Sequence, residues 1–201
     1  MKKDNEKQGL GVRGGNQKGE KMKPIGPLMK EHRLIEQMVQ LLDRQLKLMN
    51  ETNTADVAFL MIAVDFFRTY ADRTHHGKEE DILFKKLSKK LLSAKDAQTM
   101  KELVEEHVWA RKTVTRLAAA KEKYQQGGKD ALGEIVTCVK ELIDFYPTHI
   151  LKEDKSFFYP SLEYFSKEEQ DQMLQEFWEF DRKLIHEKYQ KIVDDIKNSA
   201  N

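Results

Sequence analysis

The spacing of apolar residues is the feature that most constrains the fold of this chain. In the first helical stretch, seam positions follow one another at alternating steps of four and three residues, which places them on one face of an α-helix. This seam consists of Leu28, His32, Ile35, Val39, Leu42, Leu46 and Met49. Three further stretches carry helical seams, and no run of useful length alternates as a β-strand does. The sequence therefore predicts an all-α fold.

Turn and cap residues divide the chain into five predicted helices. Residues 1–26 offer little to bury and are expected to form a disordered tail. Breaks follow at residues 50–54, 93–96, 126–128 and 159–166. The last break ends at Ser166, which together with Glu169 has the spacing of a capping box at the start of the last helix. We predict an antiparallel up-down four-helix bundle over residues 27–160, with an additional C-terminal helix in residues 161–201 packed on it.

Composition excludes several classes of function. The chain has 35 Lys and Arg against 34 Asp and Glu, a balance that gives no electrostatic reason to expect nucleic acid or a membrane as partner. No stretch approaches the roughly 18 apolar residues of a membrane span. The single cysteine, Cys138, excludes an internal disulfide and a Cys-rich metal site, which fits a reducing compartment. With no apolar signal core at the start, we expect a cytoplasmic protein.

Four histidines and two carboxylates occupy seam positions, which is unusual because a buried ionisable group is costly unless another group compensates it. These candidate metal ligands are His32, His75, Glu79, His107, His149 and Glu153. In the second and fourth helices the glutamate follows a histidine by four residues, so the two side chains share a face one turn apart. A metal would compensate all six residues.

The six residues are expected to lie at one level of the bundle. A helix rises about 1.5 Å per residue and its antiparallel partner descends at the same rate, so two residues are level when the turn lies midway between them. Three midpoints fall on predicted turns: residues 53–54 for His32 and His75, Gly128 for His107 and His149, and Ser93 for Glu79 and His107.

The chain also repeats its ligand pattern. Glu31-His32 precedes His75-x-x-Lys78-Glu79, and Glu106-His107 precedes His149-x-x-Lys152-Glu153. Two helical hairpins of this plan would place two histidines on each of two metals, with the two glutamates available as bridges.

Four stretches, EHRLIE, HHGKEEDILF, EHVWAR and HILKEDKSFFYP, resemble the hemerythrin-like HHE cation-binding domain over roughly residues 27–160. The resemblance implies a four-helix bundle that holds two Fe ions in a non-haem centre bridged by two carboxylates and an oxygen species. Carried over residue by residue, it assigns His32 and His75 to one iron and His107 and His149 to the other. Glu79 and Glu153 would be the bridges.

One position departs from the oxygen-carrying hemerythrins, whose third helix supplies two histidines four residues apart. Here Arg111 stands four residues after His107, so the resemblance implies an open or water-filled position on one iron and favours a reactive, sensing or labile site. Arg111 is expected to pair with a buried carboxylate or to donate a hydrogen bond to a group that supports the ligands, rather than to bind metal itself. Tyr146, one turn before His149, is expected either to pack in the core or to donate a hydrogen bond to a metal-bound oxygen species.

Alternative ligands are present. His76 and Glu80 form a second His-x-x-x-Glu pair, but they align with polar residues, so we favour His75 and Glu79. Asp154 competes with Glu153 but lies about 100° round the helix from the four-residue position. His186, which lies 20 residues beyond Ser166, is expected to miss the site level by about 13 Å and to be a surface histidine.

Imidazole and carboxylate without thiolate suit iron or manganese better than a closed structural zinc site. The ferritin-like bundles differ, because they use more carboxylates than histidines. We therefore predict a di-iron protein that binds or senses O2, or NO, rather than an enzyme. The alternatives are a di-iron oxidase, a peroxide- or NO-handling enzyme, and an iron-handling regulatory module that acts through an unidentified protein partner.

Overall fold

The computed structural model describes residues 23–181 and 183–199, so residues 1–22 of the predicted tail lie outside the described part. Every regular element within the described residues is helical, which confirms the all-α prediction. Helix α1 begins at Ile25, inside the predicted tail, because the Ile25 side chain is buried against the rest of the protein. None of the described helices combines the length and apolar composition needed to cross a bilayer.

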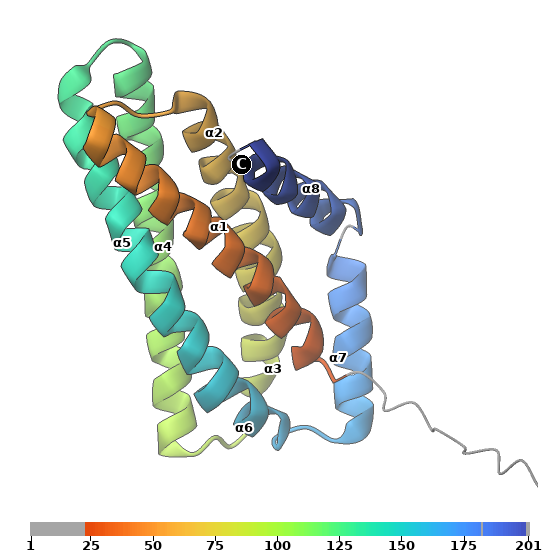
Figure 1. The fold of residues 1–201 in the computed structure, drawn as a ribbon. Coiled ribbons are helices and arrows are strands. Elements are labelled where there is room, and N and C mark those ends of the chain that lie inside the picture. Colours follow the sequence, from red (N-terminus) through yellow and green to blue (C-terminus); the bar gives the residue numbers. More distant parts are fainter. Residues whose placement is uncertain (1–22, 182, 200–201) are drawn as a thin grey trace, which may run out of the picture.

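Long helical segments lie side by side, and the chain reverses direction from each to the next (Figure 1). Helix α1 packs against α5, and α4 packs against α5 and α2. Together with the two helices at the C-terminal end, the elements are α1 (Ile25–Thr52), α2 (Val57–Phe66), η1 (Phe67–His76), η2 (Glu79–Phe84), α3 (Lys85–Leu87), α4 (Ala94–Gln125), η3 (Lys129–Ala131), α5 (Leu132–Lys152), η4 (Glu153–Phe157), α6 (Phe158–Leu162), α7 (Lys167–Phe180) and α8 (Lys183–Ser199).

The helix ends follow local side-chain chemistry. Asn53 ends α1 in the left-handed conformation that asparagine tolerates, with a φ of 53°. The Ser93 side chain accepts a hydrogen bond from the backbone N–H of Asp96 at the start of α4. Ser166 and Glu169 form the reciprocal capping box at the start of α7, as the sequence predicts.

The C-terminal region contains two helices where the sequence pattern predicts one. Helix α7 ends at Phe180, and Asp181 is extended, with φ −73° and ψ 113°, before α8 begins at Lys183. Helix α7 packs on η2, while α8 packs on α1 and η1. The break turns the chain back over the first hairpin (Figure 1).

Three segments of helix are wound as π-helix, which the sequence analysis does not predict. They are η1, η2 and η4, and they contain or border the candidate metal ligands of the second and fourth helical segments. A π-helix hydrogen-bonds five residues apart, so consecutive side chains are separated by less than the roughly 100° of an α-helix. Two neighbouring residues can then face the same interior.

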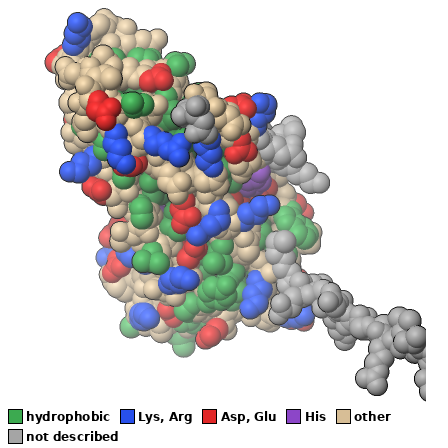
Figure 2. Space-filling view, viewed as in Figure 1, with side chains coloured by type: hydrophobic (Ala, Val, Ile, Leu, Met, Phe, Trp, Pro, Cys, Tyr) green, Lys and Arg blue, Asp and Glu red, His purple; other side chains and the backbone are tan. Residues whose placement is uncertain are grey.

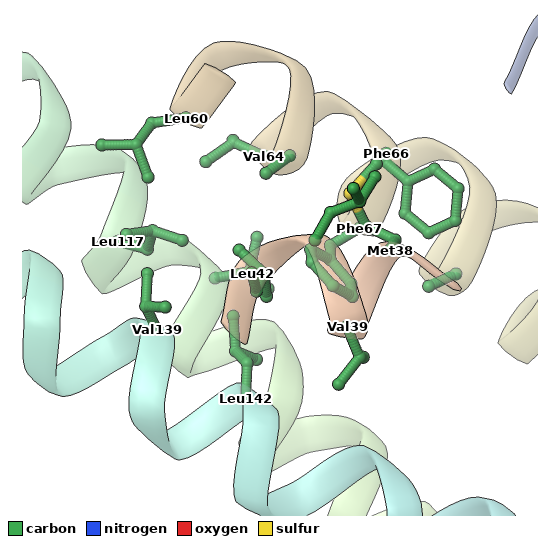
Figure 3. Packing of buried hydrophobic residues seen from close by; sticks show 14 of the residues in the cluster. Met38, Val39, Leu42, Leu60, Val64, Phe66, Phe67, Leu117, Val139 and Leu142 are labelled. Carbon is green, nitrogen blue, oxygen red and sulfur yellow. The ribbon is translucent and has the colours of Figure 1, made fainter. Parts of the chain in front are cut away.

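Two apolar clusters form the core. The larger cluster includes Leu42, Leu117 and Leu142, whose side chains point toward one another (Figure 3). The other includes Leu28, Leu103 and Phe157 together with residues of α7. The candidate metal ligands lie near the boundary between these clusters, so apolar residues border the site on both sides.

The surface is charged and mixed. On the face shown in Figure 2, Lys and Arg side chains alternate with Asp and Glu side chains, with small apolar areas between them. This agrees with the balanced composition.

Candidate metal centre

Five histidines and two glutamates converge in the interior, and each of these side chains is at least 98% buried. They come from α1, η1, η2, α4, α5 and η4, and they are His32, His75, His76, Glu79, His107, His149 and Glu153. The set contains all six residues that the sequence analysis selected and adds His76. Their donor atoms form two groups within which every pair of ligand atoms lies within 4.8 Å.

The donor atoms of this cluster have no hydrogen-bond partners. The Nε2 atoms of all five histidines and all four carboxylate oxygens of Glu79 and Glu153 are buried and unpartnered. Each such atom costs about 1–3 kcal/mol when it is left unsatisfied. The chemistry of this donor set fits a bound cation, because one positive centre satisfies imidazole lone pairs and carboxylate oxygens together.

The two glutamates lie between the two groups of histidines. Glu79 Oε1 is 3.6 Å from His75 Nε2, and Glu79 Oε2 is 3.5 Å from His107 Nε2. Glu153 Oε2 is 3.1 Å from His32 Nε2 and 3.4 Å from His149 Nε2. Metal bonds of about 2.0–2.2 Å bring ligand atoms to similar mutual distances. Either carboxylate could therefore bridge two ions.

Four of the histidines are oriented by a carboxylate behind the ring. At each one the Nδ1 atom forms a hydrogen bond of 2.7–2.8 Å, which leaves the Nε2 lone pair directed to the centre. The pairs are His32 with Asp154, His75 with Glu31, His107 with Glu80, and His149 with Glu106. From the sequence, Asp154 and Glu80 are expected only as alternative ligands, whereas in the structure each supports the histidine of another helix.

A cation stands behind each of these four carboxylates. Arg33 bonds Asp154, Lys78 bonds Glu31, Arg111 bonds Glu80 at 2.6 Å, and Lys152 bonds Glu106. Arg111 therefore pairs with a carboxylate, Glu80, which in turn supports His107. Burial opposes ionisation of Glu31, but His75 and Lys78 lower the pKa of this carboxyl group to about 2.

The pKa values of the central groups are shifted in different directions. Burial and the charge of Glu153 raise the pKa of Glu79 well above its usual range. Burial would also raise the pKa of Glu153, but the imidazoles of His149, His107 and His32 hold it well below. Burial lowers the pKa of His32, yet Asp154 and Glu153 raise it to about 9. Metal binding would displace the protons of Glu79 and His32.

The prediction that His76 faces the polar side is wrong. The π-helical winding of η1 turns both His75 and His76 inward, with their ring centroids 5.6 Å apart. The His76 ring stacks on His107 at 3.8 Å and joins the group of His107 and His149. Neither of its nitrogens has a hydrogen-bond partner, and its Nδ1 lies 3.5 Å from Asp72. In the sequence, the adjacent histidines before Gly77 are the signal that could have indicated a second inward-facing imidazole.

A cavity of about 210 Å³ reaches the cluster beside His76. Its wall combines the charged groups of Asp72 and Arg111 with aromatic surface, and it is lined by Phe67, Arg68, Asp72, His76, Ala110, Arg111, Val114, Thr115 and Tyr146. Tyr146 is buried and stacks on Phe67 with 5.1 Å between ring centroids, so the core-packing alternative for this residue holds. The cavity has room for a small ligand.

His186 lies nearer to the centre than the sequence predicts. It is half-buried, and its Nε2 is 3.7 Å from Glu31, the residue that orients His75. The expected offset of about 13 Å assumed one uninterrupted last helix. The break at Asp181 returns α8 to the first hairpin and removes that assumption.

The family model of the hemerythrin HHE cation binding domain matches residues 23–160. No curated protein and no solved structure matches the chain. The matched range contains every residue of the buried cluster and ends before α7 and α8.

Proposed function

The chain belongs to the hemerythrin HHE cation-binding family, and we propose that it is a non-haem di-iron protein that binds or senses O2 or NO. In this proposal residues 27–160 are an antiparallel up-down four-helix bundle that houses the iron, and residues 161–201 are an addition packed on it. The unpartnered Nε2 atoms and carboxylate oxygens are the observation that carries the proposal. Their number and type exceed what one ion takes in a structural site.

The two groups of donor atoms suggest an assignment of ligands. His32 and His75 would hold one iron, and His76, His107 and His149 would hold the other, because these sets cluster separately. Glu79 and Glu153 would bridge, because each lies within 3.6 Å of histidines of both sets.

His76 changes the expectation drawn from Arg111. The missing histidine of the third helix is replaced by one from η1, so the iron beside His107 would have three imidazoles rather than two. The iron with fewer protein ligands would then be the one at His32 and His75. An exogenous ligand is expected to bind where protein ligands are fewest.

Ferrous iron would supply the electrons for binding a diatomic ligand. The role of the protein's own residues would be to hold the imidazoles in place and to exclude water. Phe158 stacks on His32 at 5.5 Å, Phe145 stacks on His149 at 5.0 Å, and Phe84 lies over His107 at 6.1 Å. These rings restrict motion of the imidazoles and slow the entry of water, which limits unproductive oxidation of the metal.

Metal analysis of protein purified without oxygen tests the proposal. We expect two irons per chain and a near-ultraviolet absorption band that develops when oxygen is admitted. His75→Ala and His149→Ala should each lower the iron content, whereas Leu42→Ala, which truncates a side chain of the apolar cluster outside the ligand set, should retain both irons. Protein with no iron, or with one zinc per chain, would refute the assignment.

The cavity beside His76 favours one alternative, an enzyme that handles peroxide or NO. Arg111 presents N–H donors at the cavity, held there by Asp72 at 2.6 Å and Glu80 at 2.6 Å. A bound polar ligand would find hydrogen-bond donors that a pure diatomic carrier does not need. Multiple turnover of peroxide or NO that falls in Arg111→Leu at unchanged iron content would favour the enzyme over simple binding.

A further inference from the structure

The two hairpins repeat one supporting arrangement, but only one copy is covered. In the first hairpin, Glu31 accepts hydrogen bonds from His75 and Lys78. In the second, Glu106 accepts hydrogen bonds from His149 and Lys152. The side chains of Lys78 and Glu31 are 0% and 3% exposed, whereas those of Lys152 and Glu106 are 26% and 28% exposed. Another part of the protein therefore covers the Glu31–Lys78 pair and leaves the Glu106–Lys152 pair partly exposed.

The cover is the junction between α7 and α8. Asp181 Oδ1 accepts a hydrogen bond of 2.5 Å from Lys78 Nζ, so the buried ammonium is shared between Asp181 and Glu31. Asp181 Oδ2 lies 3.0 Å from His186 Nε2, and His186 Nδ1 is hydrogen-bonded to the hydroxyl of Tyr70 at 3.0 Å. The junction therefore reaches both η1 and the residue that orients His75.

A second contact joins the junction to the helical segment that carries His75. Phe180 lies so close to Gly77 that a Cβ atom on this glycine would come within 2.9 Å of the Phe180 ring. Gly77 directly follows His75 and His76 in the chain. A side chain larger than hydrogen at position 77 would push Phe180 away. The close packing of the junction on the segment that carries His75 therefore depends on glycine at this position.

Glu31, Asp181 and His186 form a third group of side chains of the kinds that bind metals. The ammonium of Lys78 already contacts two of them, and it supplies the positive charge that their carboxylates require. The group is therefore an ion-pair network with a resident cation rather than a third metal site.

We propose that the α7–α8 junction is a latch on one half of the metal centre, in which Asp181 and Lys78 act through Glu31 as positioning residues for His75. The inference rests on the proposed function and goes beyond it, because it assigns a role to residues outside the matched domain. The latch keeps water from the His75 side and fixes its imidazole. The iron at His32 and His75 therefore leaves the protein more slowly than the iron at His76, His107 and His149.

The charge of Asp181 is the part to remove. Asp181→Asn keeps the size of the side chain but leaves the buried Lys78 with Glu31 alone. The matched control is Glu102→Gln, since Glu102 contacts Lys152 Nζ at 3.4 Å in the equivalent place on the open half. Asp181→Glu restores the charge and should restore the wild-type behaviour.

The experiment follows iron release from the full chain, loaded anaerobically with two equivalents of ferrous iron and mixed with a ferrous chelator. The wild type should release its iron in a fast and a slow phase. Asp181→Asn should accelerate the slow phase at least tenfold and leave the fast phase unchanged, whereas Glu102→Gln should leave the slow phase unchanged. Slow phases of Asp181→Asn and wild type within a factor of two would overturn the proposal.

A measurement without metal separates failure of the latch from failure of the proposed function. In the metal-free protein, the imidazole nitrogen resonances of His75 should shift in Asp181→Asn, while those of His149 stay in place. If no iron binds, the proposed function fails, and this measurement still decides whether the latch exists. If Asp181→Asn unfolds, His186→Gln, a substitution at a half-buried position that contacts Asp181, should still shift the His75 signals. Unshifted His75 signals would then refute the latch.

Discussion

Replacing His76 with leucine should have opposite effects on the metal-free and the metal-loaded protein. Both ring nitrogens of His76 are buried without a hydrogen-bond partner, and burial together with the charge of His107 lowers its pKa well below the usual range. A neutral, unsatisfied ring in this place destabilises the metal-free fold. In the loaded protein the same ring would donate its Nε2 to iron.

The structure sets the size of the effect. An unsatisfied buried polar atom costs about 1–3 kcal/mol, and an apolar residue of similar volume removes that cost. Loss of the stacking on His107 returns part of the gain, since such ring pairs contribute about 0.5–1.5 kcal/mol. We therefore expect His76→Leu to stabilise the metal-free protein by about 1 kcal/mol and to lower its iron content.

Urea unfolding in the presence of a chelator measures this change. His149→Leu is the matched control, because its Nδ1 bonds Glu106 and the substitution breaks that hydrogen bond to a charged group. In the control, the loss of this hydrogen bond, about 1.5–3 kcal/mol, offsets the roughly 1–3 kcal/mol gained by removing the unpartnered Nε2 of His149, so its metal-free stability should change little. A His76→Leu protein that is destabilised by 1 kcal/mol or more without metal would show that His76 has a partner in solution and would refute the reasoning.

Three further predictions test the core, the titration and the cavity. Leu42→Ala removes a fully buried side chain and should cost about 2–5 kcal/mol in urea unfolding, equally with and without metal; a loss confined to the loaded protein would contradict this. Because Asp154 and Glu153 raise the pKa of His32 to about 9 against the lowering effect of burial, its contribution to metal-free stability is fully present below about pH 6.5 and is lost as the pH rises to 9. Unfolding curves at several pH values should show this loss in the wild type, and an equal loss in His32→Gln would count against it. The cavity beside His76 reaches the buried cluster, and we expect NO to enter through it before binding at the iron of His32 and His75. Ala110→Leu narrows this cavity and should slow NO association in stopped-flow measurements at constant iron content, and an unchanged rate would mean that ligands enter elsewhere.

The seam pattern predicts the helical fold and brings the right polar residues inside. His32, His107 and His149 occupy positions of their seams that an apolar residue would otherwise fill, and all three are buried at the centre. Their levels follow from the turn positions, because α-helices rise at a constant rate. These features depend only on regular geometry, which a sequence displays directly.

The sequence does not display changes of helical winding or the partners of buried side chains. His76 comes inward because η1 is π-helical, a state that no spacing rule for α-helices describes. Glu80 and Asp154 lie one residue beyond the central glutamates, and the reason for their position becomes visible only when His107 and His32 are placed beside them. The helix break at Asp181 has no glycine or proline to mark it.

Each central glutamate contacts histidines contributed by both halves of the chain, since Glu79 reaches His75 and His107 and Glu153 reaches His32 and His149. A nascent polypeptide that has left the ribosome only as far as α4 would lack Glu153 and His149 altogether. The pocket is completed when α5 and η4 emerge, and Asp181 emerges after them. A metal ion held by residues of both halves could therefore be bound completely only after η4 has been translated.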